Sequence, residues 1–490
     1  MALYPATILM TEFKAILTLV YVLFVAFTIV VIVHDKRDPV KALAWITVIA
    51  LVPVVGFVFY IVFGRNHRKE KLFSRKELRD QKQLERMTQR QLGEINDSNV
   101  LQKRLIADNR DIITLLLNNS KALLTVRNRV TILNNGKETF ASIIEALKAA
   151  RSSIHLEYYI FANDKLGKLI ARILMRKARE GVEVRFIYDD VGSWGLSPKF
   201  IHRLRKAGVE VRCFMPVAFP WLTSKINYRN HRKIVVVDGT VAFTGGINIA
   251  ERYMGRSKKL GMWRDTHLRV EGEAAHMLQS VFITDWFFVS HRQPDNPAKY
   301  FPRVRIKDEC LMQIVTSGPD SDWASIMQAF FAAITKAQKH IYIASPYFLP
   351  NEAILTAVKV ASLSGIDVRV MIPSRSDSRI VYWASRSYIS ELLDAKVKIY
   401  LYKKGFNHSK LIMIDGVFSS VGSANMDIRS FDDNFEVSAI MYDAQITAQL
   451  EAEFINDLND CEFVTPESWD DRPARQSIYE AFSRLFSPLL

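Results

Sequence analysis

Two short stretches, NHRKIVVVDGTVAFTGGIN and NHSKLIMIDGVFSSVGSAN, contain the same set of side chains that could act on a phosphate. Each places a histidine two residues before a lysine: His231 and Lys233 in the first, His408 and Lys410 in the second. Side chains two positions apart in a β-strand share one face. We therefore predict that each stretch directs one imidazole and one ammonium group toward the same place.

An asparagine follows each histidine by seventeen positions, at Asn248 and Asn425. Between them an Asp-Gly pair gives a strong hairpin-turn signal, so the returning strand should bring the asparagine back near the histidine. The aspartates of these pairs, Asp238 and Asp415, have the opposite strand parity from the histidines. For them we predict a structural role in the turn, outside the pocket.

One pocket results if the two copies face each other across a pseudo-twofold axis. It would hold two imidazoles on opposite sides of a phosphate, which Lys233, Lys410, Asn248 and Asn425 would bind. This set suits phosphoryl transfer. No metal or other cofactor is needed, because the lysines supply the positive charge.

The elements around these stretches indicate a duplicated α/β chain. Strands alternate with helices from Arg127 onward, which predicts a mostly parallel sheet in each copy. GVEVRFIYDD and GIDVRVMIPS are a matching pair, and the two histidines lie 177 positions apart, so the repeat is roughly 180 residues long. We divide the chain into a two-span hairpin, a charged helical connector, a first half and a second half, at residues 1–66, 67–117, 118–305 and 306–490.

Two apolar runs precede the repeat, at residues 16–33 and 42–63. Each is long enough to cross about 30 Å of hydrocarbon as a helix, and Pro53 and Gly56 are tolerable in a membrane helix. We predict two transmembrane helices with both outer ends on one side. The basic residues that follow the second run place that side, and the catalytic body, in the cytoplasm.

The formal net charge of +15 favours a polyanionic partner, either nucleic acid or an anionic membrane surface. The apolar runs favour the membrane. Cys213, Cys310 and Cys461 are far apart and fit neither a metal site nor a disulfide framework, so we expect three reduced thiols.

The paired stretches resemble the two HxKxxxxD motifs of the phospholipase D superfamily. With the double-span N-terminus, LEYYIF, WRDTHLRVEG, SPYFLP and the closing FSRLFSPLL, nearly the whole chain resembles the bacterial cardiolipin synthases of that superfamily. The resemblance implies two transmembrane helices followed by a duplicated phospholipase D-type α/β sandwich with pseudo-twofold symmetry. It also implies the motif residues as the catalytic set: His231, Lys233, Asp238, His408, Lys410 and Asp415.

In the family the histidine of the first motif usually acts as the nucleophile, and that of the second motif as the acid and base. This assignment makes His231 the residue that forms a phosphatidyl-histidine, and His408 the acid and base. The sequence alone leaves that assignment open. Family members also have an acidic residue at the positions of Asp265 and Glu436, where it orients the histidines. The alternative is that both residues are charges at strand edges.

The implied reaction condenses two phosphatidylglycerol molecules to cardiolipin and glycerol. Anionic phospholipids would then be the partners, and no nucleic acid is expected. Whether a second copy of the chain is also a partner stays open. The implied location is the bacterial inner membrane, as a multi-pass protein. Three alternatives stay open: a membrane-tethered phospholipase D-type hydrolase, a nuclease, and a non-catalytic membrane scaffold.

Aromatic residues near the motifs suggest lipid contact. Phe214, Phe219 and Trp221 precede the first motif, and Tyr382 and Trp383 lie in the corresponding region of the second half. The amphipathic tail SIYEAFSRLFSPLL could dock on the body or touch the membrane. Core packing is the alternative for the aromatic residues.

Overall fold

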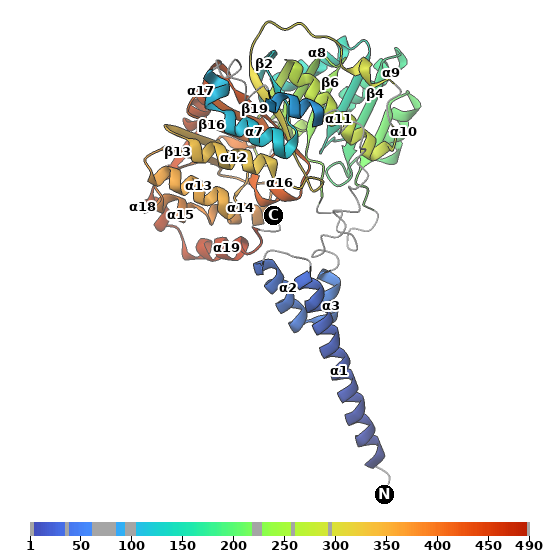
Figure 1. The fold of residues 1–490 in the computed structure, drawn as a ribbon, viewed down its shortest axis with the longest axis vertical. Coiled ribbons are helices and arrows are strands. Elements are labelled where there is room, and N and C mark those ends of the chain that lie inside the picture. Colours follow the sequence, from blue (N-terminus) through green and yellow to red (C-terminus); the bar gives the residue numbers. More distant parts are fainter. Residues whose placement is uncertain are drawn as a thin grey trace. The chain divides into compact units, whose positions relative to one another are not determined.

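The computed structural model describes residues 4–34, 39–60, 85–93, 104–217, 228–255, 260–292 and 296–487. The chain separates into two compact units, which Figure 1 shows as a ribbon. One unit comprises Met1–Lys76 with Ala218–Ile226, and the other comprises the rest of the chain. Both motifs belong to the second unit.

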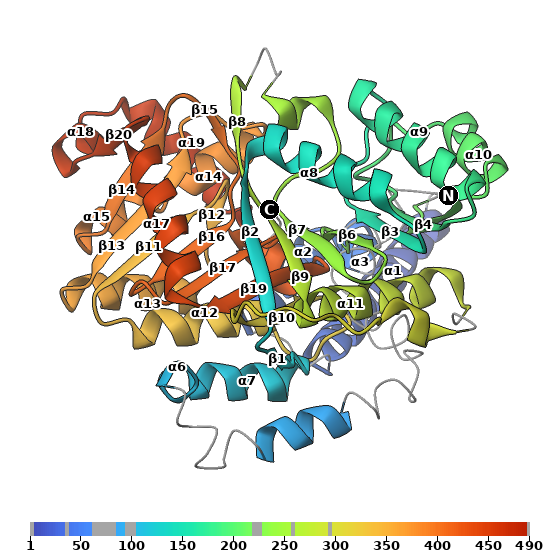
Figure 2. The ribbon, with the colours of Figure 1, turned by 90° about the horizontal axis from the view of Figure 1, so that it is seen from above.

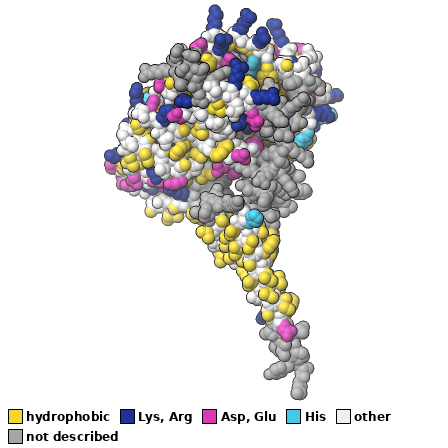
Figure 3. Space-filling view, viewed as in Figure 1, with side chains coloured by type: hydrophobic (Ala, Val, Ile, Leu, Met, Phe, Trp, Pro, Cys, Tyr) yellow, Lys and Arg dark blue, Asp and Glu magenta, His cyan; other side chains and the backbone are white. Residues whose placement is uncertain are grey.

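The N-terminal unit is helical, with α1 (Tyr4–His34), α2 (Pro39–Leu51) and α3 (Pro53–Phe59). Within the described residues, one helix is long and apolar enough to cross a membrane: the segment Glu12–His34 of α1, with a mean hydropathy of 3.0. Its apolar side chains cover the surface of this helix in Figure 3.

The second predicted span, residues 42–63, is not confirmed. Its described part is interrupted where α2 ends and α3 begins, because Val52 has φ −138° and ψ 77°. Pro53 has no N–H group and disfavours helical backbone in the residue before it. Gly56 then allows α3 to approach α2, since a Cβ atom there would lie 3.0 Å from the Val48 carbonyl oxygen. Residues beyond 60 in this run lie outside the described part.

The second unit contains two large β-sheets. The seven-stranded sheet has the order β2-β9-β7-β6-β3-β4-β5. Its strands are β2 (Asn128–Asn134), β3 (Ser153–Tyr158), β4 (Glu183–Asp189), β5 (Glu210–Phe214), β6 (Lys233–Val237), β7 (Val241–Gly245) and β9 (Thr266–Gly272).

The nine-stranded sheet has the order β1-β10-β19-β17-β16-β11-β13-β14-β20. Its strands are β1 (Leu124–Thr125), β10 (Leu311–Ser317), β11 (His340–Ala344), β13 (Asp367–Pro373), β14 (Lys398–Tyr402), β16 (Leu411–Ile414), β17 (Phe418–Gly422), β19 (Glu436–Tyr442) and β20 (Cys461–Val464).

Two small parallel pairs complete the strands. These are β8 (Met262–Arg264) with β15 (Gly405–Asn407), and β12 (Phe348–Leu349) with β18 (Met426–Asp427).

The two sheets repeat one topology, which confirms the duplicated α/β fold. Leaving aside β1 and β20 at the edges, the second sheet matches the first strand by strand, with β10 in the place of β2 and β14 in the place of β5. The prediction of mostly parallel sheets is wrong. Among the described strands of the two large sheets, only β3, β4 and β5, and their counterparts, pair in parallel, because each motif folds as an antiparallel hairpin such as β6–β7.

Helices cover the sheets, as Figure 2 shows. Apolar side chains of β6, β7, β9, β16, β17 and β19 share one buried cluster, so the two sheets face each other through these strands. Central β6 has the β-branched sequence KIVVV and is buried throughout.

The helices and 3-10 turns of this unit are α6 (Arg104–Asp108), α7 (Arg110–Ser120), α8 (Asn135–Ala149), α9 (Lys165–Arg179), α10 (Pro198–Lys206), η4 (Glu251–Met254), α11 (Glu273–Ser290), η5 (Pro297–Tyr300), α12 (Ser325–Lys336), α13 (Glu352–Leu363), α14 (Arg379–Arg386), α15 (Ile389–Asp394), α16 (Ile428–Asp432), α17 (Ala444–Leu458), α18 (Pro466–Asp470) and α19 (Ala474–Arg484).

The end of the predicted connector and the first residues of the predicted first half, through 125, join the second half of the repeat. Strand β1 pairs with β10, and the buried residues of α7 lie in the same apolar cluster as α12 and α13. The Gln313 side chain donates to the Ala122 carbonyl oxygen at 2.7 Å. Residues 85–93 are helical, whereas much of the remaining connector lies outside the described residues.

The C-terminal helix α19 docks on the body, which is one of the two alternatives predicted for the tail. It packs on α14, where the Trp383 and Tyr479 rings lie 5.5 Å apart, while Ile478 and Phe482 are exposed. Phe214 is a core residue in contact with other aromatic rings. Phe219 and Trp221 lie outside the described residues.

Candidate active site

Each motif histidine lies where the backbone of its own half pairs with the backbone of the other half. Asn230, directly before His231, forms a bridge with Phe435, and the His231 amide donates to the Phe435 carbonyl oxygen at 2.9 Å. In the other half, β15 pairs with β8, and the His408 amide donates to the Arg264 carbonyl oxygen at 2.7 Å. The histidines therefore precede strands β6 and β16. We had predicted from strand parity that they lie within these strands, and this is wrong.

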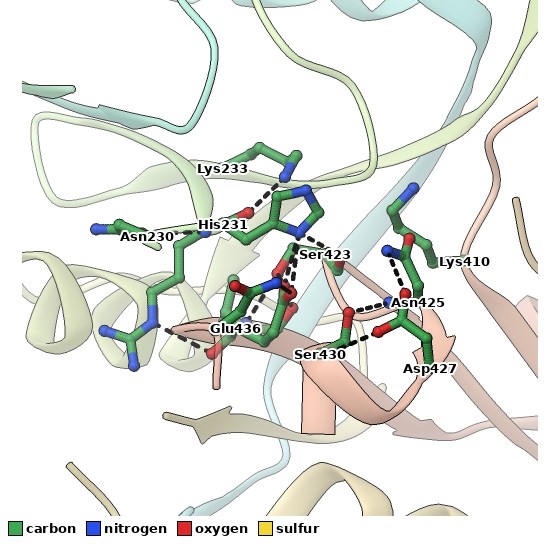
Figure 4. Close-up of polar contacts among 12 residues, drawn as sticks. Asn230, His231, Lys233, Lys410, Ser423, Asn425, Asp427, Ser430 and Glu436 are labelled. Carbon is green, nitrogen blue, oxygen red and sulfur yellow. Dashed lines mark hydrogen bonds and ion pairs between the residues drawn. The ribbon is translucent and has the colours of Figure 1, made fainter. Parts of the chain in front are cut away.

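The two carboxylates pair with the histidines in a crossed arrangement. His231 Nδ1 lies 2.9 and 3.1 Å from the two carboxylate oxygens of Glu436, which belongs to the second half (Figure 4). His408 Nδ1 lies 2.8 Å from Oδ2 of Asp265, which belongs to the first half. Each half of the fold thus supplies the carboxylate for the histidine of the other half.

The surroundings of the two carboxylates differ at one position. The Ser423 hydroxyl donates to Glu436, and the Ser423 carbonyl oxygen lies 3.1 Å from His231 Nδ1. The corresponding residue in the first half is Gly246, where a Cβ atom would overlap Oδ1 of Asp265. Glycine is therefore the residue that leaves room for Asp265 to reach His408.

Both lysines reach back to the histidines of their own motifs. Lys233 Nζ donates to the His231 carbonyl oxygen, and Lys410 Nζ donates to that of His408 at 2.6 Å. Lys410 Nζ also lies 3.0 and 3.2 Å from the two ring nitrogens of His408. In Figure 4 the Lys233 side chain lies on the side of His231 away from Glu436, and Lys410 lies to the right, beside Asn425.

Burial, together with repulsion between cationic groups, lowers the pKa values of the lysines and histidines of the site. Burial lowers the pKa of Lys233 to about 7 and that of Lys410 to about 8. Burial, followed by the charges of the two lysines, lowers the pKa of His231 to about 4, although Glu436 opposes the shift. The pKa of His408 falls well below its usual value because of burial, then Lys410, with further contributions from Lys233 and His231. The groups of both halves therefore share one electrostatic environment.

The two carboxylates respond differently to their burial. Burial would raise the pKa of Glu436, but His231 and Lys233 outweigh it, so the net pKa is lowered. Burial raises the pKa of Asp265 despite the attraction of Lys410. Glu436 is consequently the better-stabilised anion of the two.

The two asparagines lie in the same buried region. Asn248 Oδ1 accepts from the Ile160 amide at 3.0 Å, and its Nδ2 donates to the Tyr253 hydroxyl at 3.0 Å. Asn425 Nδ2 donates to Asp427 at 3.0 Å (Figure 4). Within the described residues, Asn425 Oδ1 is buried without a hydrogen-bond partner.

The motif aspartates lie at the far ends of β6 and β16 from the histidines. Asp238 has φ 51°, and its carboxylate accepts the amides of Arg151, Ser152 and Ser153. Asp415 has φ 55° and accepts the amides of residues 338–340 in the same way. Both carboxylates thus hold the loop that leads into the neighbouring strand.

Two arginines that the sequence analysis did not single out fix the crossing strands. Arg232 is paired with Asp285 and donates to the Glu436 carbonyl oxygen at 3.2 Å. Arg264 is paired with Asp457 at 2.7 Å and donates to the Asp265 carbonyl oxygen at 2.8 Å. Their places beside His231 and Asp265 were visible in the sequence, but their partners on α11 and α17 were not.

Within the described parts of the chain, no group of three or more histidine, cysteine or acidic residues is placed to hold a metal ion. Cys213, Cys310 and Cys461 are free.

Comparisons with known proteins identify the same segments. The family model described as "Cardiolipin synthase, PLD-like domain" matches residues 143–286 and 330–458, and the model described as "Phospholipase_D-nuclease N-terminal" matches residues 19–65. A cardiolipin synthase from a Geobacillus species is 45% identical, covering 96% of this chain and 92% of its own length. The major cardiolipin synthase ClsA of Bacillus subtilis is 40% identical, covering 97% and 99%.

A phosphatidylserine synthase from Haemophilus influenzae has a solved structure with a similar fold. The TM-score is 0.59 at 14% identity, and the match covers 79% of this chain and 100% of that one. At this identity the likeness supports the fold alone.

Proposed function

We infer that this chain, which belongs to the cardiolipin synthase family of phospholipase D-like enzymes, transfers a phosphatidyl group through a histidine intermediate at the crossed site. The enzyme is a phosphatidyltransferase that makes cardiolipin. The observation that supports the mechanism is the pair of crossed contacts, His231 with Glu436 and His408 with Asp265. They fix Nδ1 of each imidazole, so that Nε2 is the nitrogen that faces the reacting groups; Nε2 of His408 lies 3.2 Å from Lys410 Nζ.

In the proposed first step, Nε2 of neutral His231 attacks the phosphorus of a phosphatidylglycerol. The P–O bond to glycerol breaks, and the glycerol oxygen takes a proton from His408. In the second step, His408 removes the proton from the hydroxyl of a second phosphatidylglycerol, whose oxygen attacks phosphorus and releases His231. Cardiolipin and glycerol are the products, and one phosphodiester replaces another.

Binding of the anionic phosphodiester would prepare His408 for its role as an acid. The charges of Lys410 and Lys233 contribute to the low pKa of His408 in the free enzyme. A phosphodiester seated against these lysines counteracts their charge and favours a proton on His408. The same anion stabilises the ammonium forms of the lysines, which then stabilise the charge that develops in the transition state.

We assign the attacking role to His231 because its partner is the stronger anion. Glu436 has the lowered pKa and a hydroxyl donor in Ser423, whereas the pKa of Asp265 is raised. An anionic acceptor at Nδ1 stabilises the positive charge that the imidazole acquires when Nε2 bonds to phosphorus.

The proposed location is the inner membrane, with the catalytic unit in the cytoplasm. The apolar segment Glu12–His34 supports membrane attachment. The basic residues that follow the second apolar run support a cytoplasmic body. Anionic lipid would be both substrate and attachment surface.

The purified protein, supplied with phosphatidylglycerol in mixed micelles, should make cardiolipin and glycerol without a nucleotide-activated lipid or added metal. His231→Ala and His408→Ala should abolish the reaction. Phosphatidic acid as the sole product would indicate a hydrolase, and cleaved DNA a nuclease. A requirement for a nucleotide-activated lipid would refute the proposal.

A further inference from the structure

One arginine in each half holds the same position relative to the motif. Arg252 follows Asn248 by four residues, and Arg429 follows Asn425 by four residues. Arg252 lies in η4 and Arg429 in α16, the short helices that follow the two asparagines. The internal duplication thus relates these arginines as it relates the histidines. The mechanism described above uses neither of them.

Arg252 is linked to the catalytic pocket by hydrogen bonds. Its Nη2 donates to the Tyr253 hydroxyl at 3.2 Å, and that hydroxyl accepts from Asn248 Nδ2 at 3.0 Å. The ring of Tyr253 lies 6.1 Å from that of His408, edge to face. Tyr253 is buried, whereas Arg252 is exposed. The guanidinium group therefore lies between solvent and Asn248, on the His408 side of the pocket.

The charge environment places Arg252 beside the same histidine. Asp377 accepts from the Tyr347 hydroxyl at 2.8 Å. Against the effect of burial, Tyr253 and then the Asp377 carboxylate raise the pKa of Arg252. Asp377 also opposes the burial and the Lys410 charge that lower the pKa of His408. Arg252 and His408 are thus within the influence of one carboxylate.

The charge of Arg429 acts on Tyr159, which lies beside the other motif histidine. Burial and Asp189 raise the pKa of Tyr159, and the Arg429 charge is the largest of those that oppose the shift, ahead of that of Arg252. The Tyr159 ring lies 4.9 Å from that of His231, edge to face. The Arg429 charge therefore acts on this neighbour of His231 more strongly than the Arg252 charge does.

The two steps of the reaction make different demands on these sides. The group that leaves in the first step is glycerol, which has no charge. The acceptor in the second step enters on the same His408 side and brings its own phosphodiester, three glycerol carbons from the attacking hydroxyl. A second anion beside the first requires a cation, and a guanidinium group can donate two parallel N–H bonds to phosphate oxygens.

We propose that Arg252 binds the phosphodiester of the acceptor phosphatidylglycerol and so selects a lipid, in preference to glycerol or water, as the second substrate. This inference rests on the proposed function. It makes Arg252 a determinant of the acceptor and leaves the formation of the phosphatidyl-enzyme independent of it.

The test compares two acceptors in one preparation. Exchange of labelled glycerol into phosphatidylglycerol uses an acceptor without phosphate, whereas cardiolipin formation uses one with phosphate. Arg252→Gln should lower cardiolipin formation on the order of 10- to 100-fold relative to glycerol exchange, as expected for loss of charge-assisted hydrogen bonds. Arg252→Lys should restore part of the loss. Arg429→Gln, the related substitution on the other side, should not produce this selective loss.

Equal losses of both reactions in Arg252→Gln, with an unchanged thermal unfolding midpoint, would overturn the inference. So would the same selective loss in Arg429→Gln. A wild-type protein that neither exchanges glycerol nor makes cardiolipin would instead overturn the proposed function, and the inference with it.

Discussion

Replacing each carboxylate by its amide should affect the two crossed pairs unequally. In Asp265→Asn the amide oxygen should keep the position of Oδ1, which accepts the Thr266 amide at 2.9 Å. The introduced NH2 group then faces His408 Nδ1, where a donor favours the tautomer with its proton on Nε2. That tautomer cannot accept a proton at Nε2 from the incoming alcohol.

Glu436→Gln should be milder for two reasons. The hydroxyl of Ser423, which donates to Glu436, can rotate and accept from the introduced NH2 group, so that the amide oxygen stays on His231. The Ser423 carbonyl oxygen, 3.1 Å from His231 Nδ1, also remains as an acceptor and favours a proton on that nitrogen.

The expected losses follow from tautomer control. A carboxylate-to-amide change that forces the wrong tautomer costs about 10⁴ in kcat in the serine protease triad. We expect a loss of this order for Asp265→Asn, about 5 kcal/mol, and about 10²- to 10³-fold for Glu436→Gln, about 3–4 kcal/mol. Initial rates of cardiolipin formation from phosphatidylglycerol in mixed micelles measure both. Equal losses, or a larger loss in Glu436→Gln, with both variants folded, would refute this reasoning.

Three further outcomes are expected. Asp238→Ala should lower the free energy of unfolding by about 2–4 kcal/mol, because three backbone amides lose a charged acceptor. The folded fraction should keep its kcat. Loss of kcat at unchanged stability would contradict this expectation. Gly246→Ala should reduce activity about as much as Asp265→Asn, because its Cβ atom displaces the Asp265 carboxylate, and a fully active variant would contradict the overlap. Burial lowers the pKa of Lys233 to about 7 and that of Lys410 to about 8, so both lysines lose their charge as pH rises from 7 to 9. The value of kcat/KM for the anionic lipid should therefore fall over this range, mainly through KM. A profile still rising at pH 9 would contradict this expectation.

Much of the fold could be predicted because the chain repeats itself. The paired motifs and the matching strands gave the duplicated α/β architecture, and the spacing of Asn248 and Asn425 indicated that they return toward the site. The direction of several strands was missed. Helix-strand alternation predicted parallel pairing, but the motif itself is an antiparallel hairpin that adds antiparallel strands to each sheet.

The crossed pairs could not be predicted from spacing within either half. The register that brings Phe435 beside Asn230, and Arg264 beside Asn407, depends on how two copies of the fold pack together. The second apolar run is not confirmed as a membrane helix, because Pro53 interrupts its described part between α2 and α3.

The account depends on one covalent intermediate that both halves of the chain create and resolve. Rapid quenching of the reaction with phosphatidylglycerol labelled in its phosphate, followed by alkaline proteolysis and peptide mapping, identifies the residue that bears phosphorus. We expect the label on His231. In His408→Ala the label should form more slowly, because the first step lacks its acid, and decay more slowly, because the second step lacks its base. Label on His408 alone, or cardiolipin formation with no labelled histidine at any time, would contradict the account.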